Sequence, residues 1–261
     1  MYPVLFSIGS FEITSFGVMV AVGAALGYWL FSRELRRSGL PPSGTDAALY
    51  GIVGGMVGAK LLWVAEHAAE EPIVALLMSR GGMSWFGGFA GGLGVGVAVL
   101  LHRRLPIIPV LAAATPGFAF GQLIGRIGCF LVGDDYGRPS NLPWAVAFPQ
   151  GLPPTAVPVH PTQIYEALCL GVLGWLLIRW RRRHVSDLQI LGRYLLIAGT
   201  VRFVIELIRV NDRVLWGLTV AHLVSLMLMI GGALVLWRFP RTASNVGNMR
   251  SSHGVPAPPS R

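Results

Sequence analysis

The stretch PVLAAATPGFAFGQLIGRIGCFL, residues 109–131, decides the fold class of this chain. It is long enough to cross a bilayer as a helix, which takes about 20 predominantly apolar residues. Its one charged residue is Arg126, close to its end. A charge inside such an apolar run is costly in lipid and is by default a functional-site hypothesis there. The stretch therefore raises the question whether the chain is a membrane protein.

The composition of the 261 residues answers that question. Apolar residues make up 53% of the chain, charged residues make up 13%, and the mean hydropathy is +0.61. Because soluble domains carry about 25% charged residues, this deficit indicates an integral membrane protein. The formal net charge of +9 comes from basic residues in short connections beside apolar runs. It therefore indicates membrane topology and argues against nucleic-acid binding.

Seven apolar runs predict about seven transmembrane helices in an all-α integral membrane protein. The runs lie at about 14–31, 47–64, 84–101, 109–131, 161–178, 188–208 and 215–237. The segments after the first, third, fifth and seventh runs are basic, whereas those after the second and fourth, and the N-terminal segment, are acidic or mixed. Because basic connections stay in the cytoplasm, this alternation predicts an N-terminus outside and a C-terminus in the cytoplasm.

The predicted domain organisation is a single polytopic membrane domain with a tail. The domain covers residues 1–238 and has an extracytoplasmic connection at about 133–160, whereas residues 239–261 are predicted to be a disordered cytoplasmic tail. Glycines four residues apart in the first four runs predict close helix packing in lipid. Cys129 and Cys169 lie in separate runs without CxxC spacing, so neither a metal site nor a disulfide framework is predicted.

Three groups of polar residues fall at the predicted outer ends of helices. They are the stretch at 126–138, the run HPTQIYE at 160–166 and the run RFVIELIR at 202–209. The candidate site residues in these groups are Arg126, Asp134, Arg138, His160, Gln163, Tyr165, Glu166, Arg202, Glu206 and Arg209. Arginines at one membrane level are typical of an anion site, because guanidinium binds phosphate by paired hydrogen bonds and stays charged in apolar surroundings. The simplest anion at that depth is a phospholipid head group.

Two of these arginines also fit a purely structural role. Arg202 and Glu206 are one helical turn apart, so they can form an intrahelical ion pair. Arg126 can extend its guanidinium to the membrane interface.

The three groups resemble the prolipoprotein diacylglyceryl transferase family. The similar motifs are GRIG at 125–128, YGRP at 136–139, HPTQIYE at 160–166 and RFVIELIR at 202–209. The resemblance extends from about residue 3 to residue 237. It implies transfer of the diacylglyceryl group of phosphatidylglycerol to the lipobox cysteine thiol of a preprolipoprotein, which forms a thioether and releases glycerol-1-phosphate.

The resemblance also implies partners, a location and roles. The partners are phosphatidylglycerol, the lipobox peptide and the lipid bilayer of the bacterial inner membrane, and no cofactor or metal is needed. The predicted catalytic residues are Arg126, Arg202 and Glu206, with Glu206 orienting Arg202. The predicted substrate-binding residues are Arg126, Asp134, Arg138, His160, Gln163, Tyr165, Glu166 and Arg209.

Several positions depart from the family pattern, namely Phe16, Lys60, Phe86, Cys129, Ala198 and the pair Ala221-His222. Phe86 stands where the family has a histidine, and Cys129 stands where it has an asparagine. His160 and His222 are the candidates that remain for accepting the thiol proton. Two interpretations stay open, a divergent active transferase or an inert paralogue that binds anionic phospholipid. A small transporter is a third alternative, but it requires polar residues along the whole depth of the bundle, and Lys60 is the main charge away from the outer ends.

Overall fold

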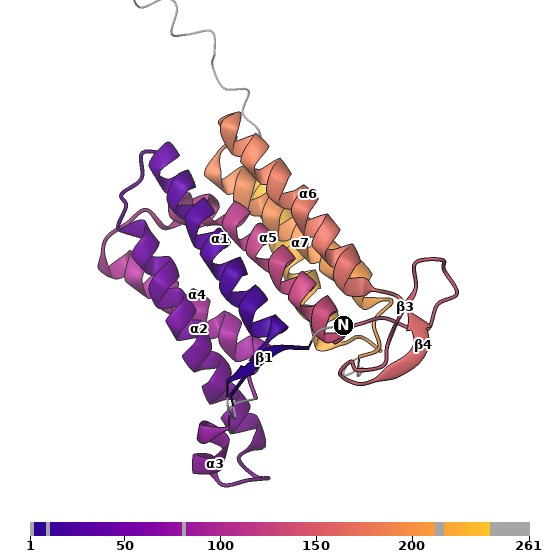
Figure 1. Cartoon of the computed structure of the whole chain (residues 1–261). Helices are drawn as coiled ribbons and strands as arrows, with labels where there is room; N and C mark the ends of the chain where they lie inside the picture. Colours follow the sequence, from indigo (N-terminus) through magenta and orange to yellow (C-terminus); the bar gives the residue numbers. More distant parts are fainter. Residues whose placement is uncertain (1–2, 9–10, 80–81, 212–216, 241–261) are drawn as a thin grey trace, which may run out of the picture.

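The chain is mostly helical in a computed structural model that describes residues 3–8, 11–79, 82–211 and 217–240. Within these ranges the long helices are α1 (Ser15–Arg37), α2 (Gly44–His67), α4 (Trp85–His102), α5 (Ile107–Val132), α6 (Thr162–Arg182), α7 (Asp187–Glu206) and α8 (Val220–Arg238). A short helix, α3 (Ile73–Met78), follows α2. Two antiparallel pairs of strands accompany them, β1 (Val4–Ile8) with β2 (Phe11–Thr14) and β3 (Val146–Phe148) with β4 (Thr155–Val159). Both pairs and α3 lie at the lower end of the molecule in Figure 1.

In the described part of the chain, five helices are long and apolar enough to cross a membrane. They are α1, α2, α5, α7 and α8. The apolar part of α4 is shorter, and α6 carries three arginines in its last turn, Arg179, Arg181 and Arg182. The prediction of a helical, multi-pass membrane protein is thus confirmed. Residues 241–261, which form most of the predicted tail, lie outside the described ranges.

Several helices run further into basic segments than the apolar runs predict. α1 continues to Arg37 and α6 to Arg182. Arginine is a good helix former, and a cation in the last turn interacts favourably with the helix dipole. Helices α7 and α8 are each shorter than predicted, because α7 ends at Glu206 and α8 begins only after Thr219. The Thr219 side chain caps α8 by accepting a hydrogen bond from the His222 N–H.

Glycines set the closest helix contacts, as their spacing predicts. A Cβ added at Gly58 of α2 would lie 2.4 Å from the carbonyl oxygen of Gly87 in α4. A Cβ added at Gly117 of α5 would lie 2.5 Å from the carbonyl oxygen of Gly27 in α1. Only hydrogen fits at such positions, so the backbones of α2 and α4, and of α1 and α5, approach one another directly.

Two clusters of buried apolar residues lie toward the basic end of the bundle. One cluster joins α1, α2, α4 and α5 through Phe31, Leu35, Ala47, Leu100, Val110 and Ala113. A second joins α5, α6 and α7 through Ala112, Ala119, Leu173, Leu177 and Ile190. At this same end the buried Arg181 guanidinium binds Glu34 at 3.0 Å and Asp187 at 3.3 Å. The polar groups of the sequence lie at the other ends of these helices, which are the C-terminal ends of α5 and α7 and the N-terminal end of α6.

Three local structures were not predicted. The β1–β2 hairpin replaces an irregular N-terminal segment, and β3 and β4 form within the connection at about 133–160. The third is α3, near which the charge of Lys60 is satisfied. The Lys60 Nζ donates to the carbonyl oxygen and to the hydroxyl of Ser79, both at 2.9 Å. The strands are short, so little in the sequence of any one of them alone indicates it.

Candidate functional site

Backbone hydrogen bonds join the three polar groups of the sequence. The Gly137 N–H donates to the His160 carbonyl at 2.9 Å, and the His160 N–H donates to the Arg138 carbonyl at 3.0 Å. The Arg138 N–H donates to the Ile208 carbonyl at 2.9 Å. The segment after α5 therefore passes between the start of α6 and the end of α7. A Cβ at Gly137 would lie 2.9 Å from atoms of His160, Thr162 and Ile208, so the crossing requires glycine.

The end of α5 turns the next two residues back toward the helix. Gly133 caps α5 in the left-handed conformation, with φ 78°, and its N–H donates to the Cys129 carbonyl at 2.8 Å. Glycine adopts this conformation without steric cost. Asp135 is also left-handed, with φ 61°, which aspartate tolerates better than most residues. The two turns bring the Asp135 carboxylate back to Arg126, one turn before Cys129.

The first turn of α6 anchors the backbone of this loop. The Thr162 hydroxyl donates to the Asp135 carbonyl at 2.7 Å, and the Gln163 side-chain amide donates to the Asp134 carbonyl at 2.5 Å. Thr162 and Gln163 are buried. Their bonds fix both aspartates by the main chain, so the carboxylates remain available for other partners.

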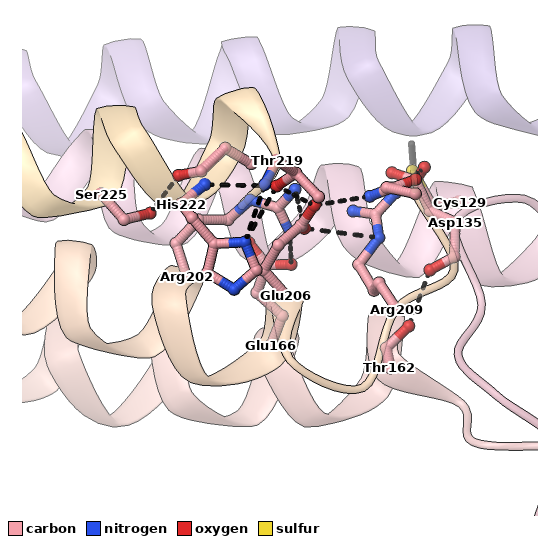
Figure 2. A network of polar contacts seen from close by, with 12 residues as sticks. Cys129, Asp135, Thr162, Glu166, Arg202, Glu206, Arg209, Thr219, His222 and Ser225 are labelled. Carbon is pink, nitrogen blue, oxygen red and sulfur yellow. Dashed lines mark hydrogen bonds and ion pairs between the residues drawn. The ribbon is translucent and has the colours of Figure 1, made fainter. Parts of the chain in front are cut away.

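Three arginines and three carboxylates form a closed alternating ring, which we call the arginine–carboxylate ring (Figure 2). In order its members are Asp135, Arg126, Glu166, Arg202, Glu206 and Arg209. The Arg126 Nη1 lies 2.7 Å from Asp135 Oδ2, and its Nε lies 3.0 Å from Glu166 Oε2. The other oxygen of Asp135 accepts a hydrogen bond from Arg209 Nη2.

The α7 side of the ring has one short contact and two long ones. The Arg202 Nη2 lies 2.7 Å from Glu206 Oε2, one helical turn away as predicted. The Arg202 Nη1 lies 3.8 Å from Glu166 Oε2, and the Arg209 Nε lies 3.9 Å from Glu206 Oε2. These two distances exceed hydrogen-bond length. Arg202 Nη1 and Arg209 Nε accordingly have no hydrogen-bond partner among the described residues.

Polar residues outside the ring hold Glu206. Its Oε1 accepts from Asn211 Nδ2 at 2.7 Å and from the Thr219 hydroxyl at 2.8 Å. The same Thr219 hydroxyl lies 3.0 Å from His222 Nδ1, and both residues are buried (Figure 2). These bonds connect the end of α7 to the start of α8. Sequence reasoning missed Asn211 and Thr219, although a threonine three residues before a polar residue is a helix-start pattern.

The arginines of the site are paired with carboxylates, whereas the convergent arginines of the sequence predict a cationic site for an anion. Three convergent arginines alone would carry three uncompensated charges, but three carboxylates alternate with them. Buried charges are stable only when paired and hydrogen-bonded, which explains why the arginines of this membrane protein come with acids. An external anion must therefore use the spare donors or compete with a carboxylate already present.

The adjacent aspartates have opposite electrostatic surroundings. Burial raises the pKa of Asp134 above its ordinary value, and the charge of Asp135 adds to that effect. Burial also opposes ionisation of Asp135, but Arg209 and then Arg126 outweigh it and lower the pKa of that carboxyl. The arginines thus favour the ionised form of Asp135, whereas its surroundings disfavour ionisation of Asp134.

Other predicted site residues lie beside the ring. Arg138 is exposed, and its Nη2 donates to the Leu207 carbonyl at 3.0 Å. His160 Nδ1 lies 3.4 Å from the Tyr165 hydroxyl, which accepts from Trp144 Nε1 at 2.7 Å. These contacts support the loop around the ring. Phe86 does not belong to the helices that carry the ring. It lies on α4, which packs mainly against α2.

One group of described residues has the composition of a metal site. Ligand atoms of Cys129, Asp134 and Asp135 lie within 4.8 Å of one another. However, the Arg126 Nη1 lies 4.0 Å from the Cys129 sulfur, and both oxygens of Asp135 already pair with arginines. A cation there would face the positive charge of Arg126 and would compete with the arginines for Asp135, so we do not assign a metal site to this group.

Comparison with known proteins finds relatives along almost the whole chain. Residues 3–238 match a family described as prolipoprotein diacylglyceryl transferase. A protein of Pseudoalteromonas translucida, named phosphatidylglycerol–prolipoprotein diacylglyceryl transferase, is 32% identical over 254 residues, which cover 91% of this chain and 92% of that protein. A protein of the same name from Vibrio vulnificus is 33% identical over 258 residues, which cover 92% of each chain.

A relative from Methylococcus capsulatus carries the same name. It is 31% identical over 249 residues, which cover 90% of this chain and 94% of that protein. The matched region includes every helix of the described structure and all six residues of the arginine–carboxylate ring. The chain therefore belongs to the prolipoprotein diacylglyceryl transferase family.

Proposed function

We propose that this chain transfers the diacylglyceryl group of phosphatidylglycerol to the lipobox cysteine thiol of prolipoproteins, a step in lipoprotein maturation. The observation that supports this most is the arginine–carboxylate ring within a chain of this family. Arginines from α5 and α7 and from the segment after α7 meet there, and Arg202 Nη1 and Arg209 Nε have unused donor capacity among the described residues. A phosphodiester offers the oxygens that such donors bind.

The proposed reaction is a displacement at carbon. The thiolate sulfur attacks the glycerol carbon that carries the phosphate ester, so a carbon–sulfur bond forms as the carbon–oxygen bond breaks. The electron pair of the broken bond leaves with glycerol-1-phosphate, and the thiol proton passes to a base. Thiolate, not thiol, is the attacking form. Negative charge grows on the departing phosphate oxygen, where preplaced cationic donors lower the barrier.

We assign the donor role at the departing oxygen to Arg126 and Arg202, and Arg209 contributes a further donor to the same phosphate. Glu206 is a positioning residue, because it bonds Arg202 at 2.7 Å and is itself held by Asn211 and Thr219. Glu166 does the same for Arg126, at 3.0 Å. His160, Gln163 and Tyr165 support the loop that carries the two aspartates, and Arg138 joins that loop to the end of α7.

We further propose seven membrane spans in the bacterial inner membrane. In this arrangement α4 and α6 also cross, the N-terminus and the ring lie on the outer side, and the basic helix ends lie in the cytoplasm. The last turns of α1, α6 and α8 are basic. The ring lies at the C-terminal ends of α5 and α7, away from these basic turns. The prolipoprotein would thus meet the ring where a secreted chain emerges.

The test is replacement of a bacterium's own transferase. A strain depleted of that enzyme would receive the native gene, Arg126→Ala or Arg202→Ala, and purified proteins would be assayed with labelled phosphatidylglycerol and a lipobox peptide. We expect the native chain to restore growth and each variant to lose transfer by at least about 100-fold. Arg182→Ala, at the exposed basic end of α6, is the matched control and should retain activity.

Two results would count against the proposal. Native-like turnover in both ring variants would show that the arginines do not stabilise the departing phosphate. Failure of the native gene to restore growth despite normal membrane expression would favour the alternative, a paralogue that binds anionic phospholipid without transferring its diacylglyceryl group.

A further inference from the structure

Asp135 differs from the other two carboxylates of the arginine–carboxylate ring. It lies on the loop after α5, and its side chain is 37% exposed, whereas those of Glu166 and Glu206 are 9% and 0% exposed. Glu166 and Glu206 belong to helices α6 and α7. Asp135 is therefore the ring carboxylate that a molecule from outside can reach first.

The contacts of Asp135 resemble those of a bound phosphate. One oxygen pairs with Arg126 Nη1 at 2.7 Å and the other with Arg209 Nη2, so a single negative charge bridges two guanidinium groups. A phosphodiester presents two unsubstituted oxygens that share one negative charge, and guanidinium binds both groups by similar charged hydrogen bonds. Exchange of one for the other conserves the net charge of the ring.

We propose that Asp135 occupies the phosphate's place in the lipid-free protein and leaves it when the phospholipid phosphate binds between Arg126 and Arg209. This inference rests on the proposed function, because it takes a phosphodiester lipid as the ligand. Asp135 then competes with both substrate and product for the same donors. Its return after transfer would help to expel glycerol-1-phosphate, which keeps the phosphate group but has lost its lipid anchor.

The way that Asp135 is held suits such an exchange. Its backbone carbonyl is bound by the Thr162 hydroxyl at 2.7 Å, so the loop stays fixed when the side chain rotates away. Its carboxylate pairs with Arg126 and Arg209, and the phosphate would satisfy both of these partners. Glu206 could not leave so simply, because Asn211 and Thr219 would lose their acceptor and unsatisfied buried donors are costly.

The experiment compares anion binding by the native protein and by Asp135→Asn. Full-length proteins in phosphatidylcholine nanodiscs would be titrated calorimetrically with inorganic phosphate and with glycerol-1-phosphate, and the KM and kcat for phosphatidylglycerol would be measured separately. We expect Asp135→Asn to bind both soluble anions about tenfold more tightly. In the native protein the Asp135 carboxylate occupies the phosphate position in most molecules, and the apparent affinity for an anion is reduced to the fraction of molecules in which that position is free. The KM for phosphatidylglycerol should fall and kcat should fall with it, since product leaves more slowly.

Three further variants make the result specific. Asp135→Ser, a second neutral replacement, should also bind phosphate more tightly, whereas Asp135→Glu, which keeps the charge, should stay near native affinity. Asp46→Asn makes the same chemical change at the other end of the molecule, where Asp46 pairs with Arg103 at 2.8 Å, and should leave phosphate affinity unchanged. Folding of every variant would be checked by its thermal unfolding midpoint.

Each outcome decides the inference. If neither neutral variant binds soluble phosphate more tightly than the native protein, or if a change appears only with phosphatidylglycerol, Asp135 is not a competitor for the phosphate position. If the neutral variants bind phosphate more tightly but the native protein transfers no diacylglyceryl group, the inference about Asp135 survives and the proposed transferase activity fails.

Discussion

Asp134 and Asp135 are neighbours in the chain, yet their carboxylates have different partners and different electrostatic surroundings in the structure. Asp135 is paired with two arginines, and its pKa is lowered because they outweigh its burial. Asp134 is outside the ring, and burial raises the pKa of its carboxyl. Its Oδ1 is buried without a hydrogen-bond partner in the described part of the structure. The difference arises from where the left-handed turn at Asp135 directs each side chain, which the sequence Asp-Asp does not reveal.

Replacement of Asp134 by asparagine should stabilise the fold at neutral pH. A carboxyl whose pKa is raised in the folded state favours folding while it is protonated, and this contribution is lost as the pH rises through the folded pKa. At pH 7 the native protein therefore bears the cost of ionising Asp134, and Asp134→Asn does not. We expect a higher thermal unfolding midpoint for the variant at pH 7 and a difference that narrows as the pH falls toward about 4.

The comparison for this prediction is Asp46→Asn in the same detergent. That variant loses an ion pair with Arg103 in which both partners are partly exposed, so it should lower the midpoint slightly or leave it unchanged. A lower midpoint for Asp134→Asn at pH 7 would mean that the ionised carboxylate makes a favourable contact that outweighs its burial.

At the scale of secondary-structure elements, glycine positions decide which helices pair. α2 pairs with α4, α1 with α5, and α7 with α8, and in each pair a glycine faces backbone atoms of its partner helix. Lipid chains are as apolar as leucine, so close van der Waals packing of backbones replaces the hydrophobic drive that pairs helices in water. The four-residue spacing of small residues could be read from the sequence, but the choice of partner could not.

Two glycines of α4 provide a matched test of this packing. A Cβ at Gly91 would lie 2.4 Å from the Gly54 carbonyl oxygen in α2, whereas a Cβ at Gly94 would meet nothing within 4 Å. We expect Gly91→Ala to destabilise the protein by about 1–3 kcal/mol through overpacking. Gly94→Ala should be neutral or stabilising by up to about 1 kcal/mol, because alanine is the better helix former.

The free energy of unfolding would be measured by circular dichroism in mixed micelles, as the fraction of denaturing detergent is increased. If both substitutions are neutral or stabilising, α2 and α4 are separated enough to accept a methyl group at either position. If both destabilise the protein equally, α4 is sensitive to loss of its glycines wherever they lie, and contact with α2 is not the reason.

At the scale of the whole molecule, the two ends of the bundle are chemically different. One end has basic last turns, a buried apolar core and the Arg181–Glu34 ion pair. The other has the two small sheets and α3 (Figure 1). The arginine–carboxylate ring lies at this second end. The excess of positive charge at one end sets the proposed orientation, and the ring is nearly balanced in charge, so it does not oppose that orientation.

Accessibility of introduced cysteines should report this orientation. In a Cys169→Ser background, Asn141→Cys places a thiol in the exposed connection after α5, and Arg183→Cys places one at the exposed end of α6. A membrane-impermeant maleimide should label Asn141→Cys in right-side-out vesicles and Arg183→Cys only in inverted ones. The reverse pattern, or labelling of both from one side, would contradict the seven-span arrangement.

Much of the fold and part of the site could be predicted from sequence. The apolar runs predict the helices because lipid requires the backbone to satisfy its own hydrogen bonds. Arg126, Arg202 and Glu206 could be selected because charges in such runs are rarely accidental. The sequence did not predict the β strands or α3, because segments of so few residues carry little local signal. It placed Asp135 in the first polar group without a role in the site, and it did not single out Asn211 and Thr219, because polar residues are common in connections between helices.

The sequence by itself determined a helical membrane protein, its basic and mixed ends, its family and the arginines that meet in the ring. The helices and the positions of the charges follow from composition and from the cost of charge in lipid, which act on each segment separately, and the family follows from the motifs. Only the tertiary structure decided that the three arginines are compensated by three carboxylates in a closed ring. That ring depends on backbone bonds from Gly137 and Arg138 to His160 and Ile208, and no local pattern specifies such bonds between distant segments.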